Sequence, residues 1–158
     1  MKETFLAQLL SAHPFTRELA DEDREALAAI SAQRSYTTDE LLIREGAPAS
    51  AFFLIVSGRA VIEVVGPGGA VQRLQTIEAG SAVGWSWLVP PYRWEFDGRA
   101  VEPTTAIVVD GAALRELAHN RCCLGLHVVE RLLIAVADRL KASRLQNLDV
   151  YAPPDARP

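Results

Sequence analysis

The most concentrated group of unusual side chains in this sequence is a short aromatic segment. All three tryptophans of the 158-residue chain, Trp85, Trp87 and Trp94, lie within ten positions, and the pair Pro90-Pro91 lies among them. An indole ring is large and apolar, stacks on flat molecules and carries one N–H donor. The tryptophans therefore have three interpretations. They line a surface for a ligand or partner, they fill a pocket that would otherwise bind one, or they form a purely structural core.

Histidine and cysteine are poorly placed for catalysis or metal binding. No histidine lies between Ala20 and Ala118, so a β-barrel enzyme built around histidine-bound metal is disfavoured. No Ser-His-Asp or Cys-His triad is readable either. Cys122 and Cys123 are adjacent, which is not the spacing of zinc ligands, and we expect two reduced, partly buried thiols. We therefore expect neither an enzyme nor a metal site.

Composition indicates one ordinary globular domain over residues 1–150, since 49% of the chain is hydrophobic and 23% is charged. The net charge of −4 argues against a nucleic-acid surface, which normally carries a basic excess. No apolar run approaches the roughly 18 residues of a membrane span, and the N-terminus does not read as a signal peptide. The expected location is the cytoplasm, with no membrane contact.

The apolar pattern changes twice along the chain. Residues 1–33 read as helical, residues 35–110 contain short apolar runs separated by glycine and proline, and residues 112–148 read as helical again. Such closely spaced short strands favour an antiparallel β-roll. The expected fold class is therefore α+β, with a jelly-roll-like β-roll flanked by N-terminal helices and a long C-terminal helix. The proline-rich tail, residues 151–158, is expected to be disordered.

The long helix, expected from about residue 124, carries a heptad-like apolar stripe. The stripe consists of Leu126, Val129, Leu133, Val136 and Leu140. This spacing is typical of helices that pair, and a helix this long exceeds what one roll needs for its own core. We expect a homodimer through this helix. The alternative is a helix packed wholly on its own roll.

Two stretches resemble the cyclic-nucleotide-binding domain family. Leu42-Ile43-Arg44-Glu45-Gly46, followed by Phe52-Phe53-Leu54-Ile55-Val56-Ser57-Gly58, resembles the opening of that family's roll, and the order of elements agrees. Residues 137–148 are similar to the dimer helix of its catabolite-activator (Crp/Fnr-like) members, which places Ser143 and Arg144 at an adenine-contacting pair. In those members a helix-turn-helix follows. Only ten residues follow Leu148 here, so we expect no helix-turn-helix.

The same resemblance exposes a change in the phosphate-binding cassette. The family places a glutamate after a glycine, then an arginine, then a serine or threonine. Here Gly84 keeps the glycine, Trp85 takes the glutamate position, Trp94 the arginine position and Glu95 the serine or threonine position. Arg93 is one residue out of register. A buried phosphate needs a compensating charge or several donors, which these side chains do not supply.

Together these features predict a stand-alone regulatory or interaction module in signal transduction. It would have a cyclic-nucleotide-binding fold, would act on an unknown protein partner, and would bind neither DNA nor cAMP or cGMP in the canonical way. The alternative is a sensor of a cyclic nucleotide or another flat ligand in a tryptophan-lined pocket. A cyclic nucleotide is the only candidate cofactor. The candidate pocket residues are Gly84, Trp85, Ser86, Arg93, Trp94, Glu95, Ser143 and Arg144.

Overall fold

A computed structural model of the protein describes the backbone of residues 2–151 and the side chains of residues 5–148. The elements follow in the order α1 (Lys2–Ala12), α2 (Asp21–Ala29), β1 (Ser31–Tyr36), β2 (Leu41–Ile43), β3 (Ala51–Ser57), β4 (Arg59–Val65), the 3-10 turn η1 (Pro67–Gly69), β5 (Val71–Glu78), β6 (Ala82–Val83), β7 (Asp97–Ala100), β8 (Thr104–Asp110), α3 (Gly111–Asn120) and α4 (Cys122–Tyr151). The predicted α+β fold with a long C-terminal helix is confirmed. Of the tail predicted from residue 151, Tyr151 ends α4 and the rest lies outside the described residues.

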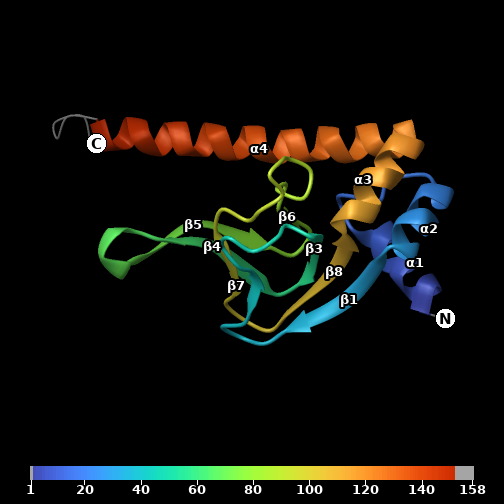
Figure 1. Ribbon diagram of the computed structural model, residues 1–158, viewed down its shortest axis with the longest axis horizontal. Helices are drawn as coiled ribbons and strands as arrows, with labels where there is room; N and C mark the ends of the chain where they lie inside the picture. Colours follow the sequence, from blue (N-terminus) through green and yellow to red (C-terminus); the bar gives the residue numbers. More distant parts are fainter. Residues whose placement is uncertain (1, 152–158) are drawn as a thin grey trace.

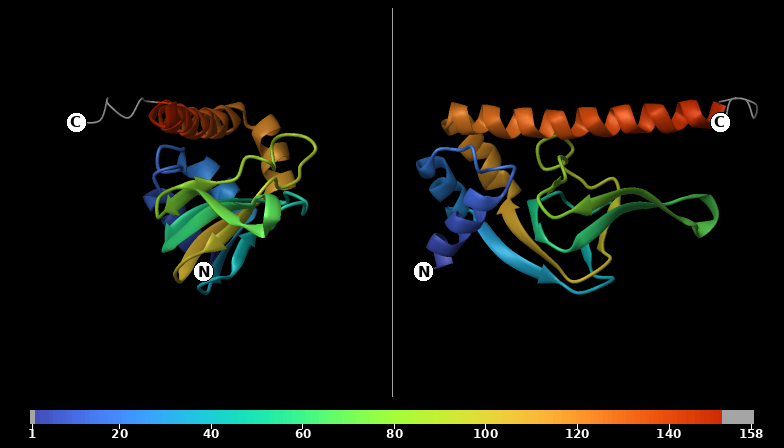
Figure 2. Two further views of the ribbon diagram at one scale, coloured as in Figure 1. Left: turned by 90° about the vertical axis from the view of Figure 1, so that its left-hand side faces the viewer. Right: turned by 180° about the vertical axis from the view of Figure 1, so that it is seen from behind.

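Two antiparallel four-stranded sheets form the roll. Their strand orders are β1-β8-β3-β6 and β2-β7-β4-β5. The hairpin β4–β5 projects from the roll on the same side as the C-terminal half of α4, while α1, α2 and α3 cover the opposite end (Figure 1). The views in Figure 2 agree that α4 runs along the whole length of the molecule above the roll.

The helical region predicted for residues 1–33 extends too far. Helix α2 stops at Ala29, and Ser31–Tyr36 is instead strand β1, paired along its length with β8. Ala32, Gln33 and Arg34 have high intrinsic helix propensity. The backbone pairing of β1 with β8 overrides that local preference. The C-terminal helices also begin earlier than expected. Helix α3 starts at Gly111 because the side chain of Asp110 accepts a hydrogen bond from the backbone N–H of Ala113.

The core has two parts that meet at the roll. One lies between the roll and the helices, and contains Leu10, Phe52, Trp87, Leu114 and Leu124 among others. The other lies inside the roll, and contains Ile43, Phe53, Ile55, Ile77 and Trp94 among others. Two of the three tryptophans are thus core residues, one in each part.

Helix α4 buries only the start of its inward face. Leu124, Val128 and Leu132 are buried against the rest of the domain. Outside this face, the stripe residues Leu126 and Leu133 are 60% and 64% exposed. Cys122 and Cys123 at the helix start are also exposed, which corrects the expectation of partial burial. Within residues 2–151, no helix is long and apolar enough to cross a membrane.

Candidate functional site

A cavity of about 730 Å³ lies between the roll and α4. Along the face of α4 above the roll, the large buried side chains of the first turns give way to a row that includes three small residues. The first part of that face carries Leu124, Val128 and Leu132, which fill the space below them. Further along, the small residues Ala135, Ala142 and Ser143 line the cavity, beside longer side chains such as Ile134 and Arg139. Small side chains at these positions leave the volume open, and it falls in the range of pockets that hold small molecules.

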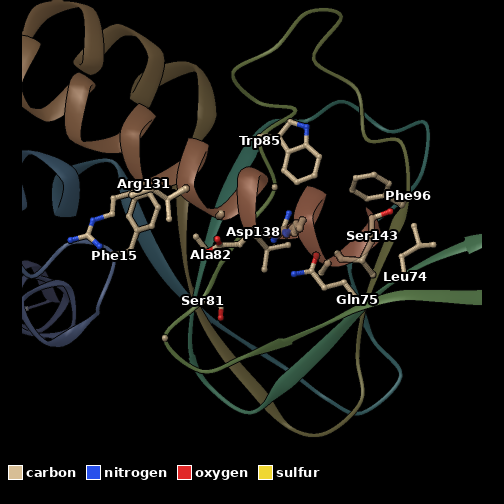
Figure 3. A pocket seen from close by; sticks show the side chains of 18 of the residues that line it. Phe15, Leu74, Gln75, Ser81, Ala82, Trp85, Phe96, Arg131, Asp138 and Ser143 are labelled. Atoms are coloured by element: carbon tan, nitrogen blue, oxygen red, sulfur yellow. The ribbon is translucent and has the colours of Figure 1, made fainter. Parts of the chain in front are cut away.

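The cavity walls are mostly apolar. Ile62, Val83 and Gly84 of the roll line it from below, and Leu74 and Gln75 of β5 line one side. In Figure 3, Trp85 and Phe96 lie toward one side of the cavity and Phe15 and Arg131 toward the other. Apolar walls with a few polar groups are typical of sites that bind small organic molecules.

Trp85, Phe96 and Arg139 form one corner of this cavity. The rings of Trp85 and Phe96 meet edge to face, with centroids 5.9 Å apart. The guanidinium of Arg139 lies over the Trp85 ring, 5.0 Å from its centroid. Burial lowers the pKa of Arg139 from its ordinary value, because burial disfavours the charged form. Sequence reasoning missed this residue, since it reads as one of several charges on a solvated helix face.

Trp94, at the position of the family's arginine, does not line this cavity. Its side chain is 5% exposed and packs on Phe53, with ring centroids 6.3 Å apart. Its six-membered ring lies directly against Gly84, whose φ is +88°. An added Cβ at Gly84 would stand 2.5 Å from the ring. Trp94 therefore fills the inside of the roll behind the glycine rather than facing α4.

Trp87 anchors the aromatic segment to the helical side of the core. It is fully buried, and its indole N–H donates to the carbonyl oxygen of Gly84 at 3.2 Å. Its ring packs against Phe52. Arg115 of α3 donates to the Trp87 carbonyl oxygen and lies over the ring of Tyr92. The three tryptophans thus face three different environments, and only Trp85 faces the cavity.

The other predicted site residues divide in the same way. Ser143 lines the cavity together with Gly84 and Trp85. Ser86 is buried, while Glu95 and Arg144 are exposed, and none of the three lines the cavity. Arg93 is exposed and turned the other way, because its guanidinium donates to the carbonyl oxygen of Gly46 at 2.8 Å.

Two further charged residues line the cavity. Arg131 is hydrogen-bonded and ion-paired to Glu18, and the hydrogen bond from Arg131 lowers the pKa of the Glu18 carboxyl. Asp138 is exposed at the rim. Within the described part of the chain, no three His, Cys, Asp or Glu side chains are placed to share a metal ion. The cavity therefore offers ring stacking, neutral hydrogen bonds and one cation, Arg139, for which no ion pair is found among the described residues.

A known family model matches much of the chain. Residues 33–121, more than half of the chain, match the model of the cyclic nucleotide-binding domain family. Among curated proteins, none matches the chain.

Solved structures share the fold. A protein from Geobacter metallireducens GS-15 named for cyclic nucleotide binding is 26% identical, with a TM-score of 0.75 over 85% of this chain and 97% of that one. A cyclic nucleotide-binding domain from Methylobacillus flagellatus KT is 21% identical, with a TM-score of 0.80 over 96% of this chain and 86% of that one. The sensor domain of the transcriptional regulator DNR from Pseudomonas aeruginosa is 20% identical, with a TM-score of 0.72 over 88% and 93% of the two chains. The chain belongs to the cyclic nucleotide-binding domain family.

Proposed function

We propose that this protein is a regulatory module that binds a small molecule in the cavity beneath α4, without the family's phosphate-binding cassette. One observation carries the proposal. The cavity is open, while the side chain at the family's arginine position, Trp94, is packed inside the roll behind Gly84. The tryptophans therefore do not plug the space between the roll and α4. This favours the sensor alternative of the two sequence-based hypotheses.

The aromatic segment is a poor receptor for a cyclic phosphate. Pro90 and Pro91 have no backbone N–H to offer. The backbone N–H groups of Leu88 and Tyr92 already donate to carbonyl oxygens within the segment. Arg93 is engaged at Gly46, as described above, and Glu95 would repel an anion. A buried phosphate without a cation or free donors is costly, so canonical cAMP or cGMP binding is not proposed.

Helix α4 is the element that would transmit the signal. The cavity lies between this helix and the roll, so a bound molecule contacts both. The same helix carries the exposed apolar stripe of Leu126, Val129, Leu133 and Leu140. Exposed leucines at heptad spacing are the usual interface of paired helices. We propose that the stripe mediates homodimerisation, so that ligand binding and assembly act on one helix.

The solved relatives support a regulatory rather than a catalytic role. They include the sensor domain of a transcriptional regulator and the regulatory subunit of a cAMP-independent protein kinase A from Trypanosoma brucei. Among the described residues that line the cavity, no hydrogen bond joins a nucleophile to a base. We propose no enzymatic activity and no nucleic-acid contact for the described module.

Calorimetric titration with cAMP and cGMP, with tryptophan emission recorded in parallel, tests this proposal. Trp85 is the one tryptophan that faces the cavity, so its emission reports occupancy. We expect no heat at micromolar nucleotide. Micromolar binding that Trp94→Phe weakens more than Ala135→Phe does would contradict the proposal, because it would place the nucleotide at the cassette. Ala135→Phe narrows the cavity beneath α4 and leaves the aromatic segment unchanged.

A second candidate function is a pure interaction module that acts through α4 without any ligand. The exposed stripe favours it, since single apolar residues on a surface are ordinary but a contiguous row is not. In that case Ala135→Phe would leave partner binding unchanged, whereas a charge in the stripe would abolish it.

A further inference from the structure

We propose that Arg139 is the anion-binding residue of this cavity, and that the ligand is a small planar molecule carrying one acidic group. This inference rests on the proposed function, because it names the ligand class of the same site. The acidic group, a carboxylate or a sulfonate, pairs with the guanidinium of Arg139. The flat apolar part packs beside Trp85 and Phe96.

Arg139 differs from the other arginine of the cavity in its partners. Arg131 is occupied by Glu18. For Arg139, the contact found among the described residues is the face of Trp85, and no ion pair or hydrogen bond is formed there. Stacking uses the face of a guanidinium and leaves the N–H groups at its edge free to donate. The edge of Arg139 is therefore available to an acceptor in the cavity.

The position of Arg139 favours an anion over a neutral acceptor. Burial makes the isolated charge costly, as its lowered pKa reflects, and an incoming anion would offset that cost. A guanidinium also binds carboxylate and phosphate oxygens with two parallel hydrogen bonds. The cation of this site would then come from α4, whereas position 94 of the roll supplies none.

The remaining charges near the site do not cancel this preference. Asp138 is the neighbouring acid on α4, but it is exposed and forms no ion pair with Arg139. Arg131 is neutralised by Glu18. The other polar groups are neutral, and Gln75, Ser143 and Gln146 can donate or accept. A single acidic group is therefore the charge that the cavity can accommodate.

The walls define the rest of the ligand. Trp85 and Phe96 present two ring surfaces at the corner where Arg139 lies, and Ile62, Leu74 and Val83 continue the apolar lining. Flat rings pack on such surfaces by stacking or edge contacts. The class is thus an aromatic or polycyclic monoanion.

Two naphthalene dyes of matched shape test the inference. The anionic probe is 8-anilino-1-naphthalenesulfonate, and the neutral probe is N-phenyl-1-naphthylamine, which lacks the sulfonate. Arg139→Gln should weaken binding of the anionic dye about tenfold or more, since hydrogen bonds to a charged group contribute about 1.5–3 kcal/mol and about 1.4 kcal/mol is tenfold. It should change the neutral dye less than about twofold. Arg144→Gln, an exposed arginine of the same helix that does not line the cavity, is the matched control.

The outcomes separate the two proposals. Equal weakening of both dyes by Arg139→Gln, or equal effects of Arg139→Gln and Arg144→Gln on the anionic dye, would overturn the role of Arg139. Ala135→Phe should weaken both dyes if they occupy the cavity. If it weakens neither, the dyes bind elsewhere, and the proposed ligand site itself fails. Circular dichroism of each variant confirms that the fold is retained.

Discussion

Replacing Gly84 with alanine tests the central claim that Trp94 fills the inside of the roll behind this glycine. The new methyl group would stand 2.5 and 2.6 Å from two atoms of the Trp94 six-membered ring. Trp94 is buried against Phe53, so its ring cannot swing into solvent. Forcing an extra carbon into packed surroundings costs about 1–3 kcal/mol. The positive φ of +88° adds a backbone cost of about 1–2 kcal/mol for alanine.

Gly46→Ala isolates the packing contribution. Gly46 also has a positive φ, +77°, but nothing lies within 4 Å of an added Cβ. We therefore expect Gly46→Ala to lower the free energy of unfolding by only the backbone cost of about 1–2 kcal/mol. Gly84→Ala should lower the free energy of unfolding by about 2–5 kcal/mol, the sum of the backbone and packing costs. The difference between the two variants measures the collision with the indole.

Urea unfolding followed by circular dichroism gives both free energies. A third variant, Gly84→Ala combined with Trp94→Phe, should recover about 1–3 kcal/mol relative to the sum of the single changes, because the smaller ring relieves the overlap. The reasoning is refuted if Gly84→Ala and Gly46→Ala cost the same within about 0.5 kcal/mol. That result would mean that the indole is free to move, and position 94 could then turn toward the cavity.

Three further predictions concern α4, a buried histidine and a helix cap. Leu133→Glu should convert the proposed dimer to a monomer in sedimentation velocity, while Lys141→Glu, an exposed charge reversal on the same helix, should not. Burial lowers the pKa of His13 from 6.5, so the unfolded chain takes up the proton first. The free energy of unfolding should therefore be highest above pH 6.5. It should fall as the pH drops from 6.5 toward the lowered pKa of His13, by up to about 1.4 kcal/mol per pH unit. A His13→Gln variant that kept this pH dependence in urea titrations would contradict the prediction. Asp110→Ala should lower the unfolding free energy by about 1 kcal/mol, since it removes the acceptor for the Ala113 N–H, and an unchanged urea midpoint would argue against the cap.

The roll and its flanking helices were predictable because local signals agree with the global fold. Gly66-Pro67-Gly68-Gly69, for example, is a run of turn-forming residues, and it joins β4 to β5. The boundary near residue 31 was not predictable. Strand β1 contains one strong strand former, Tyr36 at its end, and the pairing with β8 makes a strand of the residues before it.

The site was predictable only in part. The family resemblance marks Gly84, Trp85 and Ser143, all of which line the cavity. It could not assign each tryptophan to a face, because the segment that holds them follows neither the helical nor the strand period. The role of Arg139 was not predictable from the sequence, because a charged residue on a long helix is expected to face solvent unless the surface that it packs on is known. The cavity depends on volumes from two distant segments, which no local pattern encodes.

The change from large to small side chains along α4 also has a consequence for how ligand preference could diverge among related chains. Part of the binding volume exists because three α4 positions carry small side chains, namely Ala135, Ala142 and Ser143. These positions lie on a helix that is already anchored by Leu124, Val128 and Leu132. A substitution there reshapes the binding volume without disturbing a single strand of the roll. Selection could therefore retune the response of this protein one helical position at a time, while the stability of the domain is left to other residues.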